Sequence, residues 1–268
     1  MGFVNRKSTI VIHLSSTPFL WVLVTFPLLL FLERQVHRRL RGFFYLLTGS
    51  RKYSLYGYSL ILLPGVFLHE LSHWVFAKML GIRTGNFSIF PSEGADGSTT
   101  LGYVEYYRTP TLDPVREGLV GASPLFFGIP AVVLISQYLF NTPEILSLVQ
   151  TATPATLIQA ALSSFQSADS LVWLYVLFAV SNSMMPSSAD RRAWPLLFVA
   201  LATMVLVLYF LDAIPGLVNR YGGSATQLFS YIALAFTITI LIDMVAMMVL
   251  LFLEKMVERA TGYRIHYR

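Results

Sequence analysis

The residues best suited to chemistry in this sequence are two histidines and a glutamate within residues 69–73. The order His69-Glu70-Leu71-Ser72-His73 separates the histidines by four positions, which places both imidazoles on one face of a helix. Two imidazoles so placed can bind one metal ion, and the adjacent glutamate can act as a general base on water held by that ion. The sequence therefore predicts a hydrolytic metal site with Glu70 as its catalytic base.

These three ionisable groups occur in a chain with little charge. Of 268 residues, 55% are hydrophobic and 12% are charged, with a mean hydropathy of +0.63, whereas soluble domains have about 25% charged residues. The composition excludes a soluble enzyme, a nucleic-acid binder and a disordered chain, and it indicates a polytopic membrane protein in contact with the lipid bilayer. Each ionisable group costs about 2.5–3.5 kcal/mol in a bilayer, so a neutralising metal ion explains the cluster better than packing does.

Six apolar stretches approach the roughly 20 residues that a membrane-spanning helix needs. They lie at residues 16–33, 57–80, 118–140, 170–187, 192–211 and 226–253. We therefore expect an all-α polytopic membrane protein with about six transmembrane helices. Its parts would be an N-terminal span with a basic amphipathic loop (1–56), a core that holds the metal-site residues (57–190), and two C-terminal spans with a basic tail (191–268).

The connections between the spans differ in character. Residues 34–56 mix six basic residues with aromatic and aliphatic ones, which fits either an amphipathic segment on the membrane surface or a solvated basic loop. Residues 101–109 are strand-like and residues 92–98 form a turn cluster, so we expect a small membrane-associated β-hairpin between spans two and three. With six spans, Lys and Arg are more numerous on the side of the termini, which predicts cytoplasmic termini in an integral protein of the cell membrane.

The histidine pair needs a further ligand, because a catalytic zinc ion usually takes three from the protein. The chain has no cysteine, and its other histidines lie near the chain ends or in the basic segment, at His13, His37 and His266. The acids at or near the spans are Asp169, Asp190, Asp212 and Asp243. Asp190 ends a polar run in which Pro186 would break the helix, and such irregular backbone at membrane depth is typical of a site. Asp243, in the middle of an apolar stretch, is the secondary candidate.

This arrangement resembles the site-2 protease family of intramembrane zinc metalloproteases. The family has HExxH in an early span and, two spans later, a motif that runs from an asparagine through a proline to an aspartate, which matches Asn182 to Asp190 here. Gly121-Ala122-Ser123-Pro124 stands where the family often has an A-G-P-type turn, and the β-rich 83–116 segment stands where the family has a hairpin. The resemblance covers residues 57–190. The sequence departs from the family pattern in a proline one place later and in Arg191, which replaces a glycine.

The resemblance implies a role for each matching residue. His69, His73 and Asp190 would bind one zinc ion per chain, and Glu70 would be the general base and then the proton donor. Asn182 would hydrogen-bond the substrate backbone or the tetrahedral oxyanion. Strand 101–105 would pair with an unwound substrate as an added β-strand, through residues Gly102, Tyr103, Val104 and Glu105. The implied activity is cleavage of a transmembrane or membrane-proximal segment of another membrane protein, as in regulated intramembrane proteolysis.

Two other classes of function also fit an intramembrane metal site. One is a metal-binding transporter, although transporters more often distribute their ligands over several helices and repeat them. The other is a non-catalytic, zinc-dependent membrane scaffold, which includes an inactive relative that binds membrane segments without cutting them. Glu70 separates these alternatives from an enzyme, because a structural or transport site does not need a carboxylate between two ligands.

Overall fold

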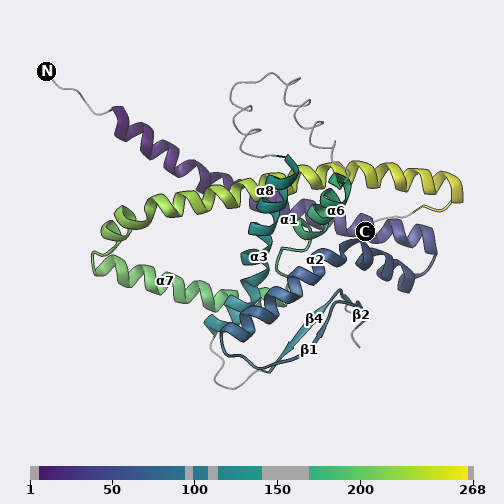
Figure 1. Cartoon of the computed structure of the whole chain (residues 1–268), viewed down its shortest axis with the longest axis horizontal. Helices are drawn as coiled ribbons and strands as arrows, with labels where there is room; N and C mark the ends of the chain where they lie inside the picture. The colour runs from purple at the N-terminus through teal and green to yellow at the C-terminus, as the bar shows by residue number, and fades with distance from the viewer. Residues whose placement is uncertain (1–5, 94–98, 108–113, 141–168, 265–268) are drawn as a thin grey trace.

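The chain folds into long helices with a small β-region at one side (Figure 1). The computed structural model describes residues 6–93, 99–107, 114–140 and 169–264. The helices are α1 (Arg6–Thr48), α2 (Arg51–Met79), α3 (Pro114–Phe140), α6 (Ser170–Ser181), the short 3-10 helix η2 (Asp190–Ala193), α7 (Trp194–Phe210) and α8 (Ile214–Thr261). The strands are β1 (Thr84–Ser88), β2 (Ser92–Glu93), β3 (Thr99–Thr100) and β4 (Tyr103–Tyr106).

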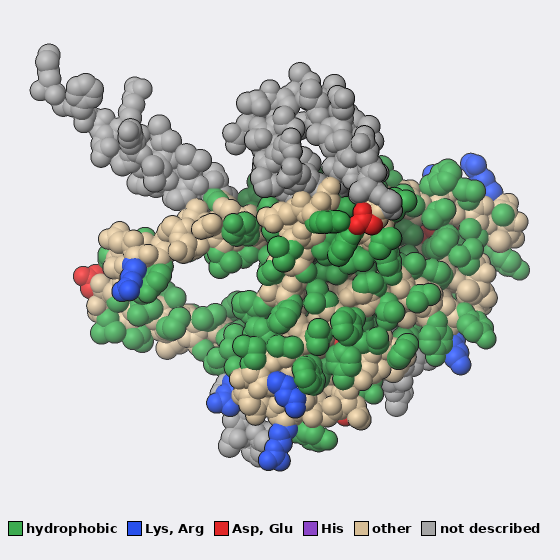
Figure 2. Space-filling view, in the orientation of Figure 1, with side chains coloured by type: hydrophobic (Ala, Val, Ile, Leu, Met, Phe, Trp, Pro, Cys, Tyr) green, Lys and Arg blue, Asp and Glu red, His purple; other side chains and the backbone are tan. Residues whose placement is uncertain are grey.

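Five helical segments among the described residues are long and apolar enough to cross a membrane. They are Pro18–Thr48, Arg51–Met79, Val115–Leu139, Asp190–Phe210 and Ile214–Thr261. Hydrophobic side chains cover most of the face seen in Figure 2, and the basic ones gather at its margins. These features fit a membrane protein and confirm the prediction of a mostly helical chain with apolar spans.

The fourth predicted span, residues 170–187, is not a full span in the part of the chain that the structure describes. Helix α6 has 12 residues, or about 18 Å, which is well short of the roughly 30 Å hydrocarbon core. The chain leaves the helix at Asn182 and runs through turns to Asp190. The described residues therefore have five candidate spans where the sequence predicts six. Residues 141–168, which precede α6 and Asp169, lie outside the described residues.

Residues 34–56 are not a loop but the end of one helix, a tight turn and the start of the next. Helix α1 continues to Thr48, a turn follows at Gly49 with φ 63°, and α2 begins at Arg51. The reason is that Val36 and Leu40 of this segment are buried against α2 in one apolar cluster, which extends the helix pair beyond the purely apolar stretch. Apolar burial of this kind stabilises a helix irrespective of the charges on its other face.

The predicted hairpin between the second and third spans is present. Strand β1 pairs antiparallel with β4, with Ser88 opposite Tyr103 and Phe87 opposite Val104, and β2 pairs with β3. Strand β4 begins two residues later than the predicted strand 101–105, and residues 94–98 of the turn cluster lie outside the described residues. Within the described residues, only one edge of β4 pairs with another strand, since its sheet has the order β1-β4.

The core that positions the site consists of α1, α2, α3, α6 and α8. Helix α1 packs along α8, and α2 contacts α1, α3 and α6. The largest buried apolar cluster joins Leu29 of α1, Val132 of α3, Leu177 of α6 and Phe236 of α8. Helix α7 has no buried residue and forms, with the first part of α8, an arm that extends away from the core (Figure 1). The core helices therefore hold the site between them, and α7 lies at its edge.

Candidate metal centre

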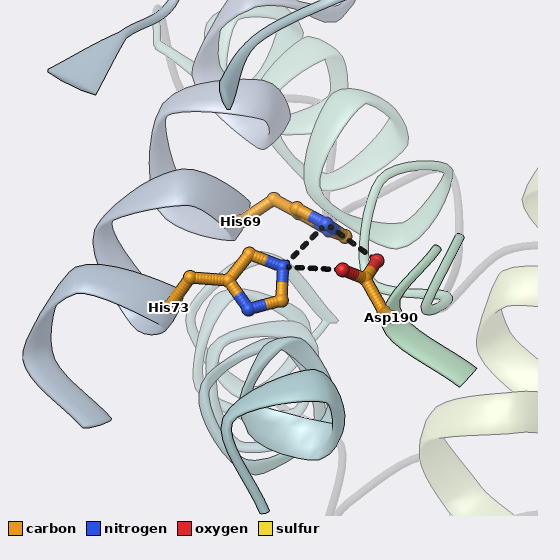
Figure 3. Close-up of side chains that lie close together, drawn as sticks. All are labelled: His69, His73 and Asp190. Carbon is orange, nitrogen blue, oxygen red and sulfur yellow. Dashed lines mark hydrogen bonds and ion pairs between the residues drawn. The ribbon is translucent and has the colours of Figure 1, made fainter. Parts of the chain in front are cut away.

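Three metal-ligating side chains converge between α2 and η2. His69 and His73 extend from consecutive turns of α2, and Asp190 faces them from the first residue of η2 (Figure 3). The Nε2 atoms of the two histidines are 3.1 Å apart, and they lie 3.5 Å and 3.3 Å from the two carboxylate oxygens of Asp190. Among the described residues, this is the one group of three or more such side chains that could hold a metal ion. The structure therefore brings together the three ligands that the sequence predicts.

The opposite nitrogen of each imidazole is held by a backbone carbonyl. His69 Nδ1–H donates to the Ser183 carbonyl at 2.6 Å, and His73 Nδ1–H donates to the Val120 carbonyl at 2.9 Å. Because a carbonyl only accepts, each ring carries a proton on Nδ1 and directs its Nε2 toward the other ring. Two Nε2 atoms at 3.1 Å, with a carboxylate beside them, call for positive charge between them, either a metal ion or an Nε2 proton donated to Asp190.

The spacing of these donor atoms fits zinc. Donors in a tetrahedral zinc site, at bond lengths of about 2.0–2.1 Å, are about 3.3 Å apart. The three separations here are 3.1, 3.3 and 3.5 Å. Two imidazole nitrogens and a carboxylate also suit zinc and other transition metals better than magnesium or calcium, which prefer oxygen ligands. Histidines that bind a metal usually donate their other ring N–H to a neighbouring group, as the two Nδ1–H groups do here.

A break in the helical backbone carries Asp190 to the histidines. Helix α6 ends at Ser181, and Asp190 then caps a turn in which its Oδ2 accepts the Ser187 N–H at 2.7 Å. Helix α3 lies so close that a Cβ placed on Gly121 would overlap the carbonyl of Asp190. Only glycine permits this approach of α3 and η2. Gly121, in the Gly121-Ala122-Ser123-Pro124 stretch, therefore has a physical role next to Asp190.

Glu70 lies beside the histidines and is 8% exposed. Gly102 packs directly on it, because an added Cβ there would be 2.8 Å from the Glu70 Cγ and 2.9 Å from the Ser88 carbonyl oxygen. A cavity of about 840 Å³ opens next to Glu70 and is lined by the three ligands and by the start of β4. A buried carboxylate next to the ligands and facing a cavity is positioned to exchange a proton with a water or a ligand there.

The predicted substrate strand contributes three of its four named residues to this cavity. Gly102, Tyr103 and Val104 line it. Glu105 does not, because its carboxylate turns toward β1 and accepts the Asn86 N–H at 3.1 Å. The role predicted for Glu105, backbone pairing with an added substrate strand, does not depend on where its side chain points and stays a prediction.

Asn182 lines the cavity, but both of its amide hydrogens are already used. Its Nδ2 donates to the Asp243 Oδ1 at 2.7 Å and to the Phe178 carbonyl at 3.1 Å. The buried Asn182 Oδ1 has no partner among the described residues. This geometry leaves only the Oδ1 acceptor of Asn182 without a partner, whereas stabilising an oxyanion would need a donor.

The other acids that the sequence analysis names as candidate ligands are not part of the metal-ligating group. Asp243 is 0% exposed and bonds Asn182, and it is not in the metal-ligating group. Asp169 accepts from Tyr138 and Trp173, and Asp212 lies in the turn between α7 and α8. His266 lies outside the described residues, and so does the side chain of His13.

Three features of the site escape sequence reasoning. The first two are the carbonyls of Val120 and Ser183, which accept hydrogen bonds from the histidine rings. They could not be predicted, because every residue has a backbone carbonyl and the residue type does not distinguish these two. The third is His37, which lines the cavity and contacts the Asn182 carbonyl at 2.9 Å and the Tyr58 hydroxyl at 2.6 Å. His37 follows Glu33 by four residues, so the two lie on one face of α1. This spacing is the sequence signal that could have indicated His37.

Comparison of the chain with family models, with curated proteins and with solved structures finds no match in any of the three.

Proposed function

We propose that this chain is an intramembrane zinc metalloprotease that cleaves a transmembrane or membrane-proximal segment of another protein. One observation carries the proposal. The Nε2 atoms of His69 and His73 converge on each other and on Asp190, while their Nδ1 atoms are tied to backbone carbonyls. The glutamate that a hydrolytic site needs, and that a structural site does not, lies between the two histidines in the sequence.

Each side chain of the site then has a task. A zinc ion held by His69, His73 and Asp190 would supply a Lewis acid that activates water for attack on a peptide carbonyl. Glu70 accepts the proton of the attacking water and passes it to the leaving amine. Asn182 offers its Oδ1 to a substrate N–H. The unwound substrate adds to β4 as a strand, which exposes the backbone carbonyls that a transmembrane helix hides.

The test is cleavage of a panel of synthetic single-span peptides by the purified protein in phosphatidylcholine nanodiscs, read by mass spectrometry. We expect the wild-type protein to cut within or next to the span of at least one peptide. The Glu70→Gln variant should retain its zinc and lose activity by a factor of about 10²–10⁴ or more. Chelation should abolish cleavage, and added zinc should restore it.

The same experiment distinguishes the alternatives. A metal-binding transporter or a zinc-dependent scaffold would bind zinc in both proteins and would cut no peptide. Cleavage that persists at full rate in Glu70→Gln, with zinc bound, would contradict the proposed role of Glu70.

A further inference from the structure

One face of α1 forms a wall of the cavity that holds the metal ligands. The residues of α1 that line the cavity are spaced by three and four positions, as one side of a helix requires. They are Leu30, Glu33, Arg34, His37, Arg38 and Arg41. From Leu30 to Arg41 this wall extends about 16 Å along the helix axis. One polar face of α1 between residues 33 and 41 is therefore turned toward the cavity.

This wall gives the cavity an excess of positive charge. Five arginines line the cavity, three from α1 and two that follow the third metal ligand, namely Arg34, Arg38, Arg41, Arg191 and Arg192. Its carboxylates are Glu70 and Asp190, which belong to the metal centre, and Glu33. Two neutral imidazoles, these two carboxylates and a divalent ion sum to no net charge. The rest of the cavity then has five arginines and a single acid, Glu33.

Several of these guanidinium groups form no direct ion pair, although Glu33 interacts electrostatically with Arg34 and Arg191. Within the described residues, Arg34, Arg41, Arg191 and Arg192 form no ion pair with a carboxylate. Two of them are held in place by backbone oxygens. Arg41 Nε donates to the His37 carbonyl at 3.4 Å, and Arg191 Nε donates to the Ser187 carbonyl at 3.3 Å. These contacts orient the two groups and leave their terminal nitrogens available for a ligand.

We propose that the cavity selects substrates with an acidic side chain near the bond to be cut, and that Arg34, Arg41 and Arg191 bind that carboxylate. This inference rests on the proposed protease function, and it names the substrate class of the same site. Arginine binds a carboxylate through parallel hydrogen bonds, and a confined cavity of one sign of charge strengthens that preference.

A peptide is favoured over a lipid headgroup as the source of the negative charge. The cavity that contains the arginines is also lined by Gly102, Tyr103 and Val104 at the start of β4. A segment that pairs with β4 occupies the same cavity as the face of α1, so side chains next to its cleaved bond come within reach of the arginines. Alternate side chains of an added strand point the same way, which gives a position-dependent preference for an acid.

The experiment measures binding separately from cleavage. A set of synthetic single-span peptides carries one Asp, moved position by position across the cleavable region, and a matched set carries Asn. Fluorescence anisotropy gives their Kd for zinc-loaded Glu70→Gln protein in phosphatidylcholine nanodiscs. Three backgrounds are compared, namely the otherwise unaltered sequence, the double variant Arg34→Gln/Arg41→Gln, and Arg220→Gln, which changes an exposed arginine outside the cavity.

We expect a Kd at least about 10-fold lower for Asp than for Asn at one or more positions. The preference should disappear in Arg34→Gln/Arg41→Gln and persist in Arg220→Gln. Equal binding of Asp and Asn peptides at every position would overturn the inference, and this comparison needs no arginine variant to fold. An Asp preference that survives in the double variant would also overturn it.

Three further results separate the possible failures. If phosphatidylglycerol in the nanodisc abolishes the Asp preference, the arginines bind lipid headgroups and the inference is wrong. If the wild-type protein cuts Asp and Asn peptides at the same rate, the protease function stands and the selectivity fails. If the Asp preference in binding is present and no peptide is cut, the selectivity stands and the proposed function fails.

Discussion

At the scale of single residues, the two Nδ1 hydrogen bonds control what the site can bind. The carbonyls of Ser183 and Val120 accept from the Nδ1 atoms of His69 and His73 and leave the two Nε2 atoms facing each other. Neither carbonyl could be predicted, because backbone oxygens are common to all residues. The sequence did predict both histidines and Asp190, since the i, i+4 spacing and the polar run after the apolar stretch depend only on residue type.

The choice of third ligand is a prediction at this scale. Asp190→Ala should weaken zinc binding by more than about 100-fold, because even outer-shell partners of metal ligands contribute 10–100-fold. Asp243→Ala should leave zinc affinity unchanged, because Asp243 bonds Asn182 and is not in the ligand group. Competition with a zinc-sensitive dye measures both affinities. A loss of zinc in Asp243→Ala with retention in Asp190→Ala would exchange their roles.

At the scale of elements, the close approach of α3 and η2 sets the position of Asp190. A side chain at Gly121 would meet the backbone of Asp190, whereas a side chain at Gly118 would meet the side chain of Leu197, with its nearest atom at 3.0 Å. A backbone obstacle cannot move aside without shifting the ligand, and a leucine side chain can adopt another rotamer.

This difference predicts the effect of two matched substitutions on α3. Gly121→Ala should lower zinc affinity by about 10-fold or more, a loss of the size that outer-shell changes cause. Gly118→Ala should leave it nearly unchanged. The same dye competition measures both variants. An equal effect of the two substitutions would contradict the proposed contact between α3 and η2.

The sequence predicted elements well where apolar stretches or turn residues define them. The hairpin, the break near Pro186 and most spans follow from such local signals. It did not predict that residues 34–56 end one helix and begin the next, because mixed arginines and apolar residues fit several structures. Nor did it predict that the face of α1 with Arg34, Arg38 and Arg41 lines a cavity. Which surface covers a charged helical face depends on tertiary packing, and a single sequence does not encode it locally.

At the scale of the whole molecule, the long helix α1, which lines the cavity, packs along the similarly long α8. Arg39 on α1 and Glu254 on α8 form an ion pair at 2.7 Å, with side chains 24% and 8% exposed. These residues are 215 positions apart in the sequence. No pattern within either helix predicts the pair, so it could not be expected before the structure was known.

Loss of this contact should affect stability and leave the chemistry intact. Glu254→Ala should lower the free energy of unfolding by about 1–3 kcal/mol, because it leaves a partly buried arginine without this partner. Glu254→Gln should have a smaller effect, since it retains a hydrogen-bond acceptor. Thermal unfolding in detergent, with zinc content measured in parallel, tests this prediction. A loss of zinc at unchanged stability would contradict the purely structural role of the pair.

The coordination sphere of the metal tests the central claim most directly. X-ray absorption at the zinc edge, on protein purified without added metal and assayed for zinc content, reports both the stoichiometry and the ligands. We expect one zinc ion per chain, with two imidazole nitrogens and carboxylate or water oxygens at about 2.0–2.1 Å. A protein that purifies without zinc and does not take it up, or a zinc ion without imidazole ligands, would contradict the account.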